Sequence, residues 1–388
     1  MAVSNALPVR ARSTRHLPVV LTWQIAVAVV ALLVTVMEVW AFALAALVVL
    51  VMLLLTVPVN GRTLLSTLGI RARFARRRRD FVEDPDTIDA LVPLVQWAPR
   101  LAITQTRSVR GTEIGVVADD NAWVGILALS SDDALIVDRG AEIDLGTVGE
   151  LTRQDDVVFS GVQVLTMTVP APTEAMLTPD SPATAAYLEV TGTAQPTPPS
   201  VRRTWLALRL DPSLCLEAVD RRGSGRAGVM ATLRFGLHRA QAQLKRQGVV
   251  ARPLEAAGIA DVLALATSVW NDDDDQPATE SWKQWHAGSL VHESREIRSF
   301  GKEPARNYQR LLDSLAQAPS MMVLTSFTIS PGEPPRGAVR QIMPTQDLAT
   351  AADEELIGET GHFIRFGPLG GIQVPGLLAT LPLGRQVS

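Results

Sequence analysis

The 388-residue sequence is poor in cysteine and in lysine, and each shortage excludes something. Its single cysteine, Cys215, cannot form an intrachain disulfide and supplies no thiolate cluster for a metal, which is typical of a reducing compartment. Lysine provides only 3 of the 36 basic residues, and this arginine bias indicates a GC-rich bacterial genome. Hydrophobic residues make up 47% and charged residues 20% of the chain, which excludes disorder of the whole chain.

Acidic residues are nearly missing from the first 80 positions. Glu38 and Asp80 are the only two there, against ten arginines, so this part carries a formal charge of +8 (ten minus two). The remainder carries −12 (26 minus 38), and the whole chain −4. Such asymmetry indicates a basic, membrane-proximal head attached to an acidic, soluble body.

Nucleotide-binding signatures are missing or misplaced. Neither Ser nor Thr follows any of the three lysines, so there is no Walker A motif and a P-loop ATPase is excluded. Gly223, Gly225 and Gly228 match Gly-x-Gly-x-x-Gly, but a dinucleotide site needs the first glycine directly after a strand. Residues 212–220 are predicted to form a helix instead. We therefore interpret these glycines as a flexible helix–helix connection.

Candidate metal ligands are few and poorly arranged. Four consecutive aspartates, Asp272 to Asp275, point in divergent directions and are interpreted as a solvated acidic loop. His286 and His292, the latter beside Glu293, lack the spacing of a zinc site and are interpreted as structural or solvent-facing. The sequence thus predicts no metal, no cofactor and no catalytic residue. Basic residues interleaved with aromatics are also missing from the acidic body, which disfavours nucleic-acid binding.

What the sequence does contain is a 41-residue apolar run from Val19 to Val59, with no glycine and one charge, Glu38. As a single helix it would extend about 60 Å, twice the roughly 30 Å of a bilayer core. Two spans over about 19–36 and 39–57 fit this length. Glu38 then lies in the turn, where it avoids the cost of a carboxylate at the bilayer centre. A cleaved signal peptide and a buried soluble hairpin are disfavoured, because the run is too long for the first and has no polar face for the second.

Flanking residues predict the orientation. Trp23 and Trp40 fall near opposite ends of the spans, as expected of interfacial aromatics, and Gln24 can bond across a helix interface. All ten arginines of the first 80 residues flank the run, which predicts that both termini are cytoplasmic. The candidate membrane or partner contacts are Trp23, Gln24, Glu38, Trp40, Arg71, Arg73, Arg76, Arg77, Arg78 and Arg79.

Residues 61–80 combine apolar side chains with arginines and predict a basic interfacial helix. A stop-transfer flank that only fixes topology, or a surface for an acidic partner, would explain the same pattern. The predicted organisation is a cytoplasmic tail over 1–18, two transmembrane helices over 19–59, a basic juxtamembrane segment and linker over 60–95, and a cytoplasmic domain over 96–388.

The cytoplasmic domain is predicted to be mixed α/β. Seven prolines mark residues 170–200 as an insertion with one ordered piece near 185–190. Strands are predicted at 101–109, 113–118, 122–129, 157–169, 204–210, 288–297, 321–329 and 337–343, and helices at 212–219, 229–247, 259–268, 305–316 and 347–355.

Several of these segments together suggest a family. The two spans, the arginine-rich segment from Arg71 to Arg79, the segment from Gly115 to Val124 and above all the run from Arg203 to Pro212 resemble the EccE component of type VII (ESX) secretion systems. The resemblance extends over nearly the whole chain, through Trp282 and His292.

This resemblance implies a non-catalytic structural subunit of an inner-membrane complex in mycobacteria and related actinobacteria. The implied partners are EccB, the ATPase EccC and EccD in a hetero-oligomer with sixfold assembly, with the mycosin protease as a further candidate and membrane lipid around the spans. It also implies a glycosyltransferase-like cytoplasmic core. The alternative is a membrane-anchored glycosyltransferase-type enzyme that uses Asp272 to Asp275 with a metal and a nucleotide sugar.

Overall fold

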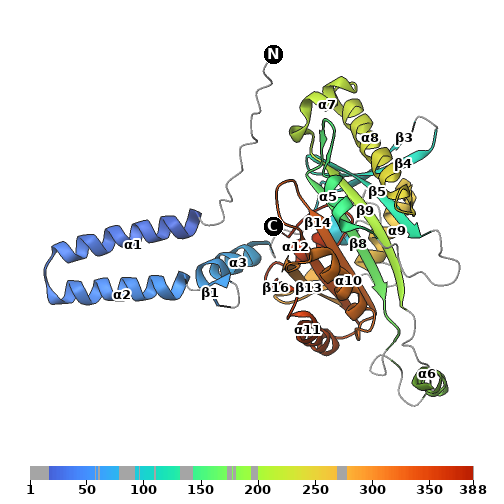
Figure 1. Ribbon diagram of the computed structural model, residues 1–388. Coiled ribbons are helices and arrows are strands. Elements are labelled where there is room, and N and C mark those ends of the chain that lie inside the picture. The colour runs from blue at the N-terminus through green and yellow to red at the C-terminus, as the bar shows by residue number, and fades with distance from the viewer. Residues whose placement is uncertain are drawn as a thin grey trace. The chain divides into compact units, whose positions relative to one another are not determined.

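The computed structural model describes residues 17–56, 58–59, 62–77, 92–95, 97–108, 111–131, 143–172, 177, 181–193, 200–268 and 278–387. The chain divides into two compact units, Met1–Arg78 and Arg79–Ser388 (Figure 1). This division falls within the predicted juxtamembrane segment and linker over 60–95. The two units are described separately.

The first unit is built from three helices. α1 (Leu17–Thr35) and α2 (Val39–Thr56) lie side by side and run in opposite directions (Figure 1). They form because neither range contains a glycine, and Pro18, the only proline in the two, stands where a helix begins. The short strands β1 (Pro58–Val59) and β2 (Arg62–Thr63) lead into α3 (Leu64–Arg77). The two predicted apolar segments are thus helical, with bounds close to those expected.

The second unit is organised around one large sheet. Its described strands follow the order β11-β12-β13-β15-β14-β8-β9-β5-β4-β3, with β10 beside β5 and β16 beside β13, and each pair is antiparallel. The strands are β3 (Ala102–Arg107), β4 (Glu113–Asp119), β5 (Ala122–Ser131), β8 (Gly161–Val169), β9 (Val201–Leu210), β10 (Val249–Pro253), β11 (Thr279–Glu280), β12 (Trp285–Ala287), β13 (Leu290–Ser299), β14 (Met322–Ile329), β15 (Arg336–Met343) and β16 (Arg365–Pro368). The pair β6 (Arg153–Gln154) and β7 (Val157–Val158) stands apart from this sheet.

Helices cover both faces of the sheet, because successive strand side chains point to opposite faces and both sets are apolar. One core joins Val116 and Leu208 of the strands to Leu233 of α8 and Leu311 of α10. The core on the other face packs strand residues such as Trp205 against α9, α12 and the C-terminal segment. The helices are α4 (Val92–Val95), α5 (Leu145–Glu150), α6 (Pro182–Thr193), α7 (Leu216–Arg221), α8 (Gly225–Lys245), α9 (Ala256–Thr267), α10 (Pro304–Leu315), α11 (Gln346–Thr360) and α12 (Gln373–Ala379), with a 3-10 turn at Pro212–Leu214.

The mixed α/β prediction is confirmed for this unit. Each predicted strand and helix has a counterpart, including the ordered piece of the proline-rich insertion, which is α6. Trp205 and Cys215 are buried, and Trp123 is half-buried against the first core. The short elements α4, α5, β6, β10, β11, β12, β16 and α12 lie outside the predicted strands and helices.

The glycine motif lies between two helices. α7 ends at Arg221 and α8 begins at Gly225, so no strand precedes the glycines, and the argument against a dinucleotide fingerprint is confirmed. Gly228 lets the two helices approach closely, because a Cβ there would lie 2.4 Å from the carbonyl oxygen of Val219.

The end of the chain is tied to the middle of the sheet. Gln163 of β8 donates to the carbonyl of Ala379 (2.7 Å) and accepts from the backbone N–H of Gly384 (2.9 Å). Asp119, at the end of β4, pairs with both Arg209 and Arg385. Burial by itself would raise the pKa of Asp119, but the hydrogen bonds and charges of the two arginines outweigh it and lower that pKa. The last residues are therefore part of the fold.

Candidate functional site: an apolar helix pair with a basic flank

The contact between α1 and α2 is made by small side chains. Ala26 of α1 and Ala41 and Ala45 of α2 are buried, and Ala41 is fully inaccessible. Alanines four residues apart lie on one face of a helix and allow two backbones to approach closely, as in membrane helix pairs. The sequence reading did not single out this Ala41-x-x-x-Ala45 spacing, although it is visible in the sequence.

Large apolar side chains cover the outside of this pair. On α2 they include Trp40 (60% exposed), Leu47 (54%) and Leu54 (58%). Among the described residues, α2 is the one helix long and apolar enough to cross a membrane, and the searched part of α1, Val20–Thr35, is a shorter apolar helix. The 18 residues of α2 extend about 27 Å, close to the thickness of a bilayer core. An outer surface of this kind is typical of contact with lipid or with other apolar helices.

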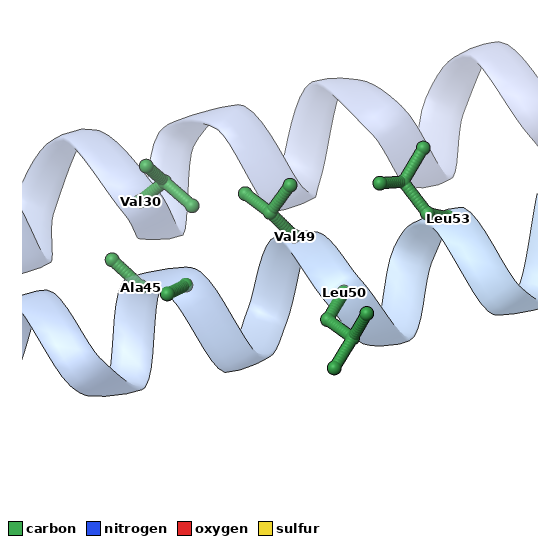
Figure 2. A pocket seen from close by; sticks show the side chains of 6 residues that line it. Val30, Ala45, Val49, Leu50 and Leu53 are labelled. Atoms are coloured by element: carbon green, nitrogen blue, oxygen red, sulfur yellow. The ribbon is translucent and has the colours of Figure 1, made fainter.

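A shallow groove lies along α2, beside Val30 of α1. Val30 of α1 and Ala45, Ala46, Val49, Leu50 and Leu53 of α2 line it (Figure 2), and its volume is about 430 Å³. The space exists because alanine occupies two neighbouring positions, Ala45 and Ala46, where longer side chains would fill it. Its lining is apolar throughout, so it suits an apolar side chain or an acyl chain.

Polar side chains of the pair lie at its ends or bond within their own helix. Glu38 is exposed in the turn, as predicted, and its carbonyl accepts from the backbone N–H groups of Ala41 (2.9 Å) and Phe42 (3.2 Å). The hydroxyls of Thr35 and Thr56 donate to carbonyls of their own helices at 2.6 and 2.7 Å. Such internal bonds remove the cost of placing a hydroxyl in an apolar medium.

The tryptophans and the glutamine lie towards the two ends of the pair. Trp40 lies at the turn end, while half-buried Trp23 and exposed Gln24 lie in the first third of α1, near the opposite end. Glu38 and Trp40 thus share the turn end of the pair, whereas Trp23 and Gln24 are chain neighbours with different exposure near the other end.

α3 provides the basic flank. It contacts α2; its Ile70 is buried and its Phe74 half-buried, whereas Leu64, Leu68, Arg71 and Arg73 are exposed. The predicted basic helix is thus present, with two apolar side chains turned inward and two outward. Side chains of Arg76 and Arg77 lie outside the described residues, as do Arg78 and Arg79 entirely.

The body brings together no group of three His, Cys, Asp or Glu side chains that could hold a metal, within the residues that the structure describes. The predicted acidic loop, Asp272 to Asp275, lies outside those residues. His286 is half-buried and His292 fully buried, and Glu293 accepts a hydrogen bond from Gln284 at 3.1 Å.

Comparison with known family models supports the resemblance to EccE that the sequence suggests. Residues 198–297 match the EccE family model, described as "Putative type VII ESX secretion system translocon, EccE". The match runs from the start of β9 through most of β13 and includes the segment Arg203–Pro212, Trp282 and His292, on which the resemblance rests. No curated protein matches the chain. The suspected relationship is thereby confirmed for this part of the chain, and the family is described as a component of a secretion system.

Proposed function

We propose that the chain is a non-catalytic structural subunit of an inner-membrane type VII secretion complex and stabilises the assembly that exports proteins. The match of residues 198–297 to a translocon component carries this proposal. In it, α1 and α2 form a transmembrane hairpin, and the acidic body makes lateral contacts in the cytoplasm with subunits of the EccB, EccC and EccD type, around a sixfold axis.

Both helices are assigned to the membrane because of their length and outer surface. α1 has 19 residues and α2 has 18, about 27–29 Å each, and a tight turn joins them at Glu38. Placing the turn outside and the arginines on both flanks inside follows the usual distribution of basic residues. The basic flank, α3, then lies at the cytoplasmic surface, where each arginine adds about 1 kcal/mol of attraction to anionic lipid.

In this proposal, a transmembrane helix of a partner subunit binds in the groove. Its apolar lining has no hydrogen-bonding group for a polar ligand, and its open side leaves Ala46 and Leu50 accessible. Gln24, on the exposed side of α1, is the proposed hydrogen-bonding contact to a neighbouring helix.

The glycosyltransferase-type alternative has less support. In open α/β sheets, nucleotides bind beyond the carboxyl ends of parallel strands, whereas the described pairs of this large sheet are antiparallel. Metal-dependent binding of a nucleotide sugar that is lost on Asp→Asn changes at Asp272 to Asp275 would favour the enzyme. Unchanged secretion in the same variants would favour the structural subunit.

The test is co-purification from detergent-solubilised membranes of a bacterium with the complete system. We expect the tagged chain to bring down an ATPase of the EccC type. Ala46→Leu fills the groove and should lower recovery several-fold, whereas Ala43→Leu adds the same atoms to an exposed position of α2 that does not line it. Recovery of the unaltered chain only as a monomer, or equal losses in both variants, would contradict the proposal or its groove contact, respectively.

A further inference from the structure

Four buried polar atoms without a hydrogen-bond partner lie on one face of three neighbouring strands. They are Trp285 Nε1 of β12, His292 Nε2 and Ser294 Oγ of β13, and Arg340 Nη2 of β15. Trp285 lies directly opposite His292, and Ser294 directly opposite Arg340. Cross-strand partners have Cβ atoms about 4.5–5.5 Å apart, so the four side chains form one patch, called here the β12–β15 patch.

α12 covers the β12–β15 patch. Gly376 packs on Ser294 so closely that a Cβ there would lie 2.7 Å from the Cβ of Ser294. Thr380 accepts a hydrogen bond from Arg340 Nε (2.7 Å), and the Gln373 side chain accepts one from the backbone N–H of Ser294 (3.0 Å). The four patch residues are at most 2% exposed. Bulk water therefore does not reach these atoms, and each one left unbonded costs about 1–3 kcal/mol.

The hydrogen-bonding roles in the patch follow from one contact. Arg340 Nη1 lies 2.8 Å from His292 Nδ1, and since a guanidinium only donates, Nδ1 accepts. Burial, followed by the charge of Arg340, lowers the pKa of His292 well below 6.5, so its ring is neutral. The proton of the neutral ring is then on Nε2. Three of the four unpartnered atoms are N–H donors, and the fourth is a hydroxyl.

The patch also carries a positive charge. Burial lowers the pKa of Arg340 to about 9, so the side chain is still charged at neutral pH. Its hydrogen-bond partners within the described residues are His292 and Thr380, both neutral. Arg295, on the opposite face of β13, shows the usual arrangement, in which Asp353 binds both Nε and Nη2. A buried charge without a partner is among the most costly features of a fold.

We propose that the β12–β15 patch binds a small inorganic anion of chloride size, held by Arg340 Nη2 and the Ser294 hydroxyl, with Trp285 and His292 as further donors. A water molecule fits less well, because it needs acceptors for its own two hydrogens and the patch offers almost only donors. An anion accepts from each donor and neutralises Arg340. It would be a structural ligand of the body, independent of the secretion partners.

The first test measures thermal unfolding of the full chain in detergent while chloride replaces gluconate at constant ionic strength. An anion that binds only the folded state should raise the Tm by about 2–4 °C for each tenfold rise in chloride above its Kd. Arg340→Met should abolish this dependence. Arg295→Met is the matched control, since it removes a paired arginine on the other face of the same strand and should keep the dependence at a lower Tm.

If Arg340→Met does not fold, Ser294→Ala removes one donor, keeps the charge and should require about tenfold more chloride for the same Tm. Crystals grown in bromide should show an anomalous peak beside Arg340. A Tm that is independent of chloride, an equal chloride dependence in all variants, or density at the patch without an anomalous signal would overturn the proposal.

Discussion

Leu47 of α2 and Leu216 of α7 are both more than half exposed, at 54% and 61%, but their surroundings differ. Leu47 belongs to a continuous apolar outer surface with Leu44 and Leu50, whereas Leu216 is followed by Glu217 and, within the same helix, by Asp220. Single exposed leucines are ordinary on water-soluble surfaces, but a helix covered by them is not. This is the difference expected if α2 faces an apolar medium, as proposed, while α7 faces water.

The two units also place their polar groups differently. The hydroxyls of Thr35 in α1 and Thr56 in α2 bond to their own helices, four residues or fewer away. Helix threonines of the body such as Thr232 bond in the same way, but other polar contacts of the body join distant segments, as Asp119 and Arg385 do across 266 positions. Long-range bonding of this kind fixes one arrangement of the sheet.

The largest expected effect comes from a test of the difference between α2 and α7. Leu47→Arg places a charge near the middle of α2, which should cost about 2.5–3.5 kcal/mol in membrane insertion and reduce the fraction of chain that resists carbonate extraction. Leu216→Arg, at an equally exposed position, should change body stability by no more than about 0.5 kcal/mol. Similar behaviour of the two variants would show that α2 is not in lipid.

An intermediate effect is expected at the C-terminal contact of the body. Asp119→Asn removes the charge that Arg209 and Arg385 share in a nearly inaccessible position and should lower the free energy of unfolding by about 1–3 kcal/mol, measured by urea denaturation. The control is Asp313→Asn, because Asp313 is 72% exposed and, among the described residues, pairs with Arg202 alone, at 3.1 Å. Equal losses would mean that the C-terminal contact contributes nothing specific.

The smallest expected effect is on the stability of the body at acidic pH. The hydrogen bond from Arg222 lowers the pKa of Asp156 to about 2 against burial, which raises it. Because this value lies below the unfolded pKa of about 3.9, the contribution is complete above pH 4 and is lost as the pH falls towards 2. The stability difference between the unaltered body and Asp156→Asn should therefore shrink across that range in urea titrations. The first unit has no such pair between residues 17 and 77, where Glu38 is the only acid.

Much of this arrangement could be predicted from the sequence, because it depends on local pattern. The bounds of α1 and α2 follow from an unbroken apolar run, and β4 and β5 follow from alternation around Asp120 and Asn121. Short elements such as the three-residue strand β12 carry too little periodicity to be recognised alone.

The missed features depend on contacts between distant segments. Arg340 was not singled out, because an arginine within a strand is usually expected at a surface, and only the register with Ser294 and the cover from α12 make it buried. The pairing of Asp119 with Arg385 requires the sheet order, which a single sequence does not give. The alanine contact between α1 and α2 could be predicted from the sequence, because a spacing of four residues, as in Ala41 and Ala45, is a local signal.

The contact between Arg385 and Asp119 also bears on biosynthesis. α1 and α2 precede Arg385 in the chain, so a ribosome makes both helices before the body can complete this contact. Asp119 pairs with Arg209 and Arg385. A chain that stops at Gly384 would lose the second of these two arginines. Full stability of the body is thus conditional on translation through Arg385.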